Sequence, residues 1–324
     1  MLGESPPDTE FAIRAVGLSK SYGRIAAVDG VDLDVPAGSV YAVLGTNGAG
    51  KTTTVRMLAT LERPDAGHAK VFGHDVVRES GIVRSLIGVT GQYASVDEDL
   101  TARENLVIFG RLVGASRRKA AVRADDLLAE FGLAHVADRA VRHFSGGMRR
   151  RLDLAASMIT RPRLLFLDEP TTGLDPRTRA QMWNTVRAMV SAGSTVLLTT
   201  QYLDEADALA DHVALMHSGR VVANGTADEL KSRVGDSCVK LTLRDPALAP
   251  IAAGVCAAFA AVEVVIDKPH QRVAVPLSDL DRLPEMLLEL RRHDIALTAV
   301  NVERPTLDEV FFELTDAADR DNVA

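Results

Sequence analysis

The chain has 324 residues and a formal net charge of −7, and this acidic balance disfavours the broad basic surface of nucleic-acid-binding proteins, so no nucleic-acid partner is expected. Its two cysteines, Cys238 and Cys256, are too few for a disulfide framework and lack metal-site spacing, which is typical of a reducing compartment. A hydrophobic share of 47% and a charged share of 25% are ordinary for globular proteins, and the length allows one large domain or two unequal ones.

The two ends of the chain, residues 1–10 and 316–324, are expected to be flexible tails. The first ten residues lack the basic and apolar regions of a signal peptide. The least charged stretch, residues 246–262, is shorter than the roughly 20 apolar residues that span a bilayer. We therefore expect any membrane role to come through a partner protein.

Residues 11–22 and 28–35 alternate apolar and polar side chains, which predicts two strands of a small antiparallel sheet. Tyr22 ends the first strand. Its ring could stack on an adenine base, although a tyrosine at such a position is more often an ordinary sheet residue.

A glycine-rich loop follows residues 39–44, which read as a buried strand, and precedes residues 52–61, which have the spacing of a helix. Strand, loop and helix in this order form the context in which G-x-x-x-x-G-K-[ST] cradles phosphates. Glycines let the backbone N–H groups point at an anion, and the helix N-terminus adds positive potential. Lys51 would contact the β- and γ-phosphates, and the Thr52 hydroxyl would ligate Mg²⁺. The residues expected to hold the nucleotide here are Gly45, Thr46, Asn47, Gly48, Ala49, Gly50, Lys51, Thr52 and Thr53.

The middle of the chain predicts a helical subdomain over about residues 95–145. Within it, residues 100–114 and 119–131 read as amphipathic helices. A short strand, residues 87–90, leads toward Gln92, whose amide could bridge a metal ion and an attacking water.

Ser145, Gly146 and Gly147 open a helix over residues 149–159 and offer a second anion-binding helix N-terminus. Because the chain already has one phosphate loop, a second suggests a composite site. The loop of one copy would face the Ser-Gly-Gly of another copy in a two-fold dimer. The rival interpretation is that Ser145 only caps its helix.

Residues 164–167 are four apolar residues followed by Asp168 and Glu169. Such a run is typical of a buried parallel strand whose carboxyl end carries chemistry. Asp168 is placed to hold Mg²⁺, and Glu169 is placed to take a proton from the attacking water. A solvated loop is the poorer interpretation because the preceding strand is apolar.

Strand and helix continue to alternate after residue 173, with a strand at 195–200 that ends at Gln201. This alternation predicts an α/β fold with a largely parallel sheet over residues 11–235. From residue 236 to 315 the order becomes strand, helix, strand, strand, helix, strand, which is the ferredoxin-like order. We expect this second, small α+β domain to be regulatory or to contact a second copy.

These features together resemble the ATP-binding subunits of ABC transporters over roughly residues 11–230. The resemblance implies a P-loop NTPase core with antiparallel β and α-helical subdomains, which binds and hydrolyses ATP with Mg²⁺ as a homodimer. It rests on the phosphate loop (similar to Walker A), residues 164–169 (Walker B), residues 144–148 (signature), Gln92 (Q-loop), Tyr22 (adenine-stacking aromatic) and Asp175 (D-loop).

Residues 88–97, 199–207 and 304–311 resemble more narrowly the daunorubicin/doxorubicin-resistance type of these subunits. This resemblance implies ATP-driven efflux of a drug, antibiotic or lipid-like compound through a separate integral-membrane permease. The chain would then lie peripherally on the cytoplasmic face of the cell membrane, with the helical subdomain touching the permease.

Three positions depart from the family pattern. Met148 stands where the signature usually has glutamine, and Thr46 stands where proline is common; both changes are expected to be tolerated. Gln201 stands where most ABC ATPases have histidine. A glutamine can hydrogen-bond the γ-phosphate but cannot titrate near pH 7. We therefore expect Gln201 to act in catalysis through this contact alone, with low turnover.

The alternative functions also use the nucleotide site but do not involve transport. ABC proteins of translation usually carry two ATPase halves and those of DNA repair a long coiled coil, whereas this chain has one phosphate loop and no sustained heptads. The remaining alternative is a soluble ABC ATPase that acts as a nucleotide-gated dimerisation module. Glu169 argues against a version that only binds ATP, because binding needs no base. A GTPase is disfavoured because the chain lacks an Asn-Lys-x-Asp element.

Overall fold

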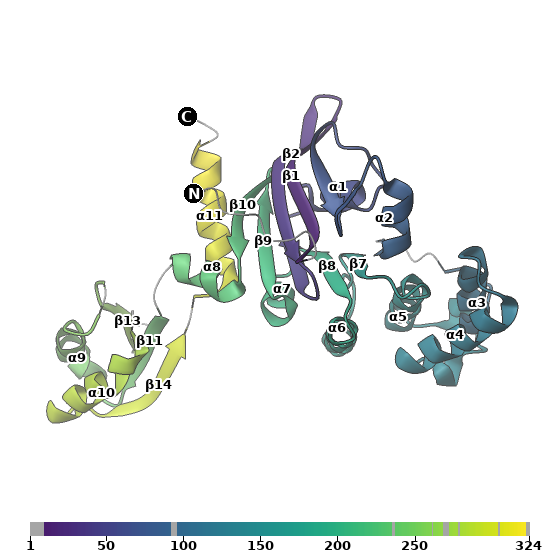
Figure 1. Cartoon of the computed structure of the whole chain (residues 1–324). Helices are drawn as coiled ribbons and strands as arrows, with labels where there is room; N and C mark the ends of the chain where they lie inside the picture. The colour runs from purple at the N-terminus through teal and green to yellow at the C-terminus, as the bar shows by residue number, and fades with distance from the viewer. Residues whose placement is uncertain are drawn as a thin grey trace. The chain divides into compact units, whose positions relative to one another are not determined.

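The computed structural model describes residues 10–91, 96–234, 237–260, 262–267, 272–277, 279–303 and 305–321. The chain divides into two compact units, Met1–Ala227 and Asp228–Ala324 (Figure 1). The boundary lies close to the one expected at residue 235 from the change in composition.

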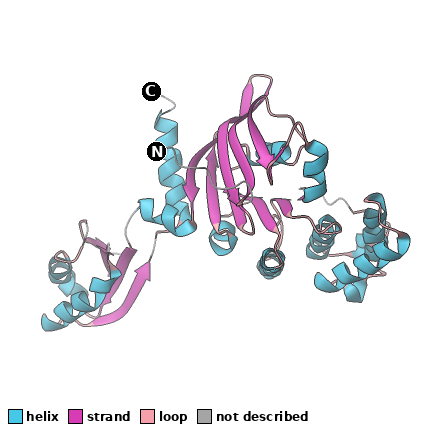
Figure 2. Ribbon diagram, viewed as in Figure 1, coloured by secondary structure: helices cyan, strands magenta, loops and turns pink. Residues whose placement is uncertain are grey.

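The first unit is built on a six-stranded sheet, seen as magenta arrows in Figure 2. Its strands pair in parallel except at one edge, where the last strand forms an antiparallel hairpin with its neighbour. The three central strands are buried along their whole length and mostly apolar, as expected for a parallel sheet covered on both faces. In spatial order the strands are β10 (Arg220–Gly225), β9 (His212–His217), β3 (Val40–Leu44), β8 (Thr195–Thr200), β7 (Leu164–Asp168) and β6 (Ile87–Thr90).

A second, antiparallel sheet packs against the first through a shared apolar core. Ile13 and Leu18 from this sheet belong to one buried cluster with Met57 and Phe166. Its strands, in spatial order, are β2 (Ile25–Pro36), β1 (Phe11–Tyr22), β4 (Ala66–Val71) and β5 (His74–Asp75). The sequence pattern predicted only the first two, because β4 and β5 are short and β4 begins with exposed residues.

Helices pack on both faces of the six-stranded sheet, and α3 and α4 lie beyond α5. Helix α1 packs between the two sheets, where it contacts β2, β4 and β7. Helices α5, α6 and α7 lie along the other side of the six-stranded sheet (Figure 1). The helices are α1 (Lys51–Leu58), α2 (Ser80–Leu86), α3 (Ala102–Leu112), α4 (Arg117–Glu130), α5 (Gly146–Ser157), α6 (Pro176–Ser191) and α7 (Leu203–Leu209), with 3₁₀ turns at Ala134–Val136 and Val141–His143.

Helices α3 and α4 form the helical subdomain expected in the middle of the chain. Thr101 and Glu104 make a reciprocal capping box that fixes the start of α3. Leu106 of α3 and Leu127 and Leu128 of α4 are fully buried. Helix α2 was not predicted from the sequence, since it has a single fully buried apolar residue, Val83, and no apolar period.

The second unit contains a four-stranded antiparallel sheet in the order β12-β13-β11-β14. With two helices inserted, the chain order is β-α-β-β-α-β, as the sequence predicts. Its own core includes Val239, Leu241, Val273 and Leu290. The elements are α8 (Ala227–Val234), β11 (Ser237–Leu243), α9 (Ala249–Cys256), β12 (Val265–Asp267), β13 (Arg272–Leu277), α10 (Leu283–Arg292), β14 (Leu297–Glu303) and α11 (Leu307–Asp321), with 3₁₀ turns at Pro246–Leu248 and Leu280–Arg282.

The end of α11 corrects one expectation. Residues 316–321 were expected to belong to a flexible tail, but the helix continues through them to Asp321. This stretch contains two alanines and neither glycine nor proline, so nothing in it interrupts a helix. Among the described residues, no helix is both long enough and apolar enough to cross a membrane.

Candidate active site

The phosphate loop connects β3 to α1, and its glycines are required by its geometry. Gly48 and Gly50 have φ angles of +82° and +101°, which side chains rarely adopt. A Cβ atom at Gly50 would lie 2.4 Å from the Ala27 carbonyl oxygen, and one at Gly45 would lie 2.4 Å from that of Met216. Gly50 is also the N-cap of α1 and supplies no side-chain cap, so the first N–H groups of α1 are left for an anion.

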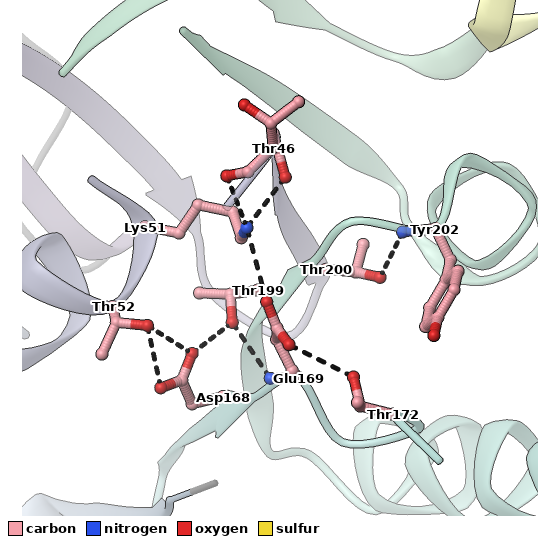
Figure 3. Close-up of polar contacts among 10 residues, drawn as sticks. Thr46, Lys51, Thr52, Asp168, Glu169, Thr172, Thr199, Thr200 and Tyr202 are labelled. Carbon is pink, nitrogen blue, oxygen red and sulfur yellow. Dashed lines mark hydrogen bonds and ion pairs between the residues drawn. The ribbon is translucent and has the colours of Figure 1, made fainter. Parts of the chain in front are cut away.

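Lys51 is the first residue of α1, and its ammonium group contacts the backbone of this loop. The Nζ atom donates to the carbonyl oxygens of Gly45, at 2.8 Å, and Thr46, at 3.0 Å (Figure 3). It also lies 3.4 Å from Glu169 Oε1. The side chain is 4% exposed, and its positive charge is held in place by the loop that is expected to bind the phosphates.

Thr52 and Asp168 bring oxygen atoms together at the carboxyl end of β7. The Thr52 hydroxyl lies 3.1 Å from each carboxylate oxygen of Asp168. Thr199 Oγ1 donates to Asp168 Oδ1 at 2.5 Å (Figure 3). Hydroxyl and carboxylate oxygens are the hard ligands that Mg²⁺ prefers, so this donor set fits the ion.

Glu169 follows β7 in a strained backbone conformation, with φ of +48°. Its N–H donates to Thr199 at the carbonyl oxygen (3.2 Å) and at Oγ1 (3.0 Å). The Thr172 hydroxyl donates to Glu169 Oε2 at 3.2 Å, and Lys51 faces Oε1 (Figure 3). The turn directs the carboxylate toward the phosphate loop, where it can accept a proton from a nucleophile next to a bound phosphate.

Lys51, Thr52 and Glu169 line one pocket of about 270 Å³. Tyr22 stands at its rim, 46% exposed, with Lys20 Nζ 5.8 Å from the centre of its ring. An exposed ring beside a phosphate loop can stack on a nucleotide base. The lining residues are Tyr22, Ala27, Asn47, Gly48, Gly50, Lys51, Thr52, Thr53 and Glu169.

The Ser-Gly-Gly segment does not line this pocket. Ser145 is exposed and caps α5, accepting a hydrogen bond from the Met148 N–H at 3.3 Å. A Cβ atom at Gly147 would lie 2.3 Å from Thr178 Cγ2, so the segment packs tightly on α6. Asp175 caps α6 by accepting from the N–H and hydroxyl of Thr178, and these bonds lower its pKa. Thr178 thus joins Asp175 to the Ser-Gly-Gly segment on one exposed surface.

The two glutamines have different positions. Gln201 is half-buried directly after β8, so it stands at the same edge of the sheet as Asp168, but it does not line the pocket. Gln92 lies outside the described residues. Sequence reasoning missed Thr199, which is the penultimate residue of the neighbouring parallel strand and pairs in register with Asp168. The signal that could have found Thr199 is that polar residues end both neighbouring strands.

Residues 28–172 match the protein family described as ABC transporter. The daunorubicin/doxorubicin resistance ATP-binding protein DrrA of Streptomyces peucetius is 53% identical over 304 residues, covering 94% of this chain and 92% of that protein. The Nod factor export ATP-binding protein I of Paraburkholderia xenovorans is 40% identical, with coverage of 73% and 78% respectively.

Among solved structures, cbiO1 from Clostridium perfringens, part of the ABC transporter complex cbiONQ, superposes with a TM-score of 0.64. The alignment covers 69% of this chain and 91% of that chain at 24% identity, so it supports the fold alone. The fold class expected from the sequence is confirmed. The chain belongs to the ABC transporter ATP-binding proteins, a family that hydrolyses ATP in transporters.

Proposed function

We propose that the chain hydrolyses ATP with Mg²⁺ to power efflux of a drug, antibiotic or lipid-like compound through a separate integral-membrane permease. The observation that carries the enzymatic part is that Lys51, Thr52 and Glu169 line one pocket and that Asp168 contacts Thr52. The drug class rests on relatives that are named for daunorubicin and doxorubicin resistance.

The residues in and around the pocket have separate proposed roles in hydrolysis. The loop N–H groups and Lys51 bind the phosphates, and Tyr22 stacks on the adenine. Thr52, Asp168 and Gln92 would hold Mg²⁺, which when bound offsets charge on the phosphate oxygens. Glu169 accepts the proton of the attacking water. Gln201 would donate a hydrogen bond to the γ-phosphate.

The remaining residues of the site are proposed to act on a second copy of the chain. Ser145, Gly146, Gly147 and Asp175 stand at the starts of α5 and α6 and do not line the pocket of their own copy. In a two-fold dimer, these residues of one copy would close the pocket of the other, so each nucleotide is held between two chains. The second compact unit is proposed to regulate or support that contact.

We propose that the permease docks beside the helical subdomain, on the cytoplasmic face of the membrane. A groove of about 430 Å³ lies among α2, β6, α3 and α5. Its wall includes the apolar side chains of Val89, Phe109, Val113 and Ile159. Val89 and Val113 are 37% and 55% exposed, so a partner would remove apolar surface from water.

Accumulation of doxorubicin in cells tests this function. Cells that lack the chain but keep its permease should accumulate more of the drug, and wild-type chain should restore efflux. The Glu169→Gln variant should not restore it, whereas Glu130→Gln, at the exposed end of α4, should. Equal efflux with Glu169→Gln and wild type would contradict the proposal.

A further inference from the structure

We propose that Arg150 is a positioning residue that holds the backbone of Glu169 and thereby aims the catalytic carboxylate. This inference rests on the proposed role of Glu169 as the base. Arg150 is the fifth residue of α5, the helix that opens with Gly146 and Gly147.

The guanidinium of Arg150 donates to four backbone carbonyl oxygens. Nε donates to Pro170 O at 3.0 Å, and Nη1 donates to Gly91 O at 2.7 Å. Nη2 donates to Asp168 O at 3.0 Å and to Glu169 O at 3.3 Å. The side chain is 12% exposed, so these carbonyl groups have little access to water as a replacement partner.

Three consecutive carbonyls, at residues 168, 169 and 170, converge on this one group because the chain turns sharply there. The turn requires the strained conformation of Glu169, with φ of +48°. Such a strained backbone conformation persists only where several contacts with its surroundings hold it in place. The Thr199 bonds hold the N–H of Glu169, and Arg150 holds its carbonyl and those on both sides.

A second feature fixes the guanidinium itself. Asp153, one turn further along α5 and 2% exposed at its side chain, lies 3.7 Å from Arg150 Nη1. Asp153 also lines the groove among α2, β6, α3 and α5. The same side chain of Arg150 therefore connects α5 to the end of β7 and to Gly91 at the end of β6. A shift of α5 would be carried to the backbone of Glu169 through these bonds.

Lysine cannot reproduce this arrangement. Its ammonium is a point charge with three donors, whereas arginine presents five N–H donors in a rigid planar fork. The Arg150→Lys variant should keep the charge and most of the packing but lose the simultaneous contact with Pro170, Glu169 and Gly91. It therefore separates positioning from charge.

The experiment compares steady-state ATP hydrolysis and MgADP affinity in Arg150→Lys and Arg150→Gln with wild type. We expect kcat to fall by about 100-fold, the loss that a displacement of about 1 Å can cause, while the Kd for MgADP changes by less than about threefold. The matched control is Arg123→Gln on α4, an arginine with a side chain 17% exposed that donates to Met158 O at 2.8 Å. This control should lower the melting temperature but leave kcat near wild type.

A double-mutant comparison makes the assignment specific. In a Glu169→Gln background, Arg150→Lys should lower kcat by less than about threefold. The Glu169→Gln variant has no catalytic carboxylate, so the loss of Arg150 has no base to displace. Wild-type kcat in Arg150→Lys, or the same fractional loss with and without Glu169, would overturn the inference. So would an equal loss of kcat in Arg123→Gln. Failure of the proposed function is a different result: Glu169→Gln itself would then hydrolyse ATP at the wild-type rate.

Discussion

Lys51 Nζ and Glu169 Oε1 face each other at 3.4 Å, which joins the start of α1 to the end of β7. Both side chains are buried, at 4% and 9% exposure. The cation thus lies between the loop carbonyls that shape the phosphate cradle and the carboxylate expected to accept a proton. In this arrangement a single pair of opposite charges connects phosphate binding to the proposed base.

Removal of the charge of Lys51 should therefore affect the site in two ways. Lys51→Met would lose the phosphate contact and leave Glu169 without its cation, so hydrolysis should fall by about 10²- to 10³-fold. Steady-state phosphate release measures this loss. The control is Lys119→Met on the exposed start of α4, which should match wild type. Full activity in Lys51→Met would exclude the proposed cradle.

Tyr22 should contribute to binding through its ring alone. Tyr22→Ala should weaken ATP binding by about 5- to 150-fold, since stacking of a base on an aromatic ring contributes about 1–3 kcal/mol. Tyr22→Phe should bind as wild type does. Calorimetric titration with ATP and with inorganic triphosphate separates the two halves of the ligand. The stacking role is wrong if Tyr22→Ala loses affinity for triphosphate as strongly as for ATP.

Gln201 should set the pH response of turnover. With glutamine, no group at this position titrates near neutrality, whereas Gln201→His introduces one with an ordinary pKa of about 6.5. We expect the variant to hydrolyse ATP faster and to show a new inflection near that pH in its rate profile. Gln181→His, on the exposed side of α6, is the control. An unchanged rate and profile would show that this position does not limit turnover.

Glu205 of α7 should make stability depend on pH. Burial raises its pKa above 4.5, although the nearby hydroxyl groups of Thr200 and Thr171 and the hydrogen bond from Trp183 oppose the shift. Arg179 and Arg150 are the nearby cations. Between pH 4.5 and the raised pKa the folded protein binds more protons than the unfolded chain, so this group's contribution to stability falls as pH rises.

The Glu205→Gln variant is neutral at every pH and can still accept the bond that Trp183 Nε1 makes at 3.2 Å. Its melting temperature should therefore rise relative to wild type between pH 5 and pH 8. Asp204→Asn, an exposed neighbour paired with Arg179, should show no such trend. A pH-independent difference between Glu205→Gln and wild type would contradict the prediction.

Much of the site could be predicted from local patterns in the sequence. The spacing of Gly45, Gly50 and Lys51 specifies a strand–loop–helix unit without help from distant residues. The apolar run before Asp168 likewise marks a buried strand end. By contrast, Thr199 reaches Asp168 only because β7 and β8 pair in parallel at that register, which a single strand cannot reveal.

The three arginines at 149–151 show most clearly what the sequence alone cannot predict. Each successive helical residue points about 100° further round the axis, so identical side chains reach different places. Arg149 pairs with Glu98, and Arg151 donates to the Phe131 carbonyl. Only Arg150 meets the backbone of Glu169. The rotation of α5 decides this difference, and the packing of the whole unit sets that rotation.

The most direct test of the central claim is ATP hydrolysis measured together with molecular size, on wild type and Glu169→Gln with Mg²⁺. We expect that the variant retains ATP, loses about 10²- to 10⁴-fold in turnover, and shifts from monomer to dimer. A Glu169→Gln variant that hydrolyses ATP normally as a monomer would contradict both the base and the shared nucleotide site.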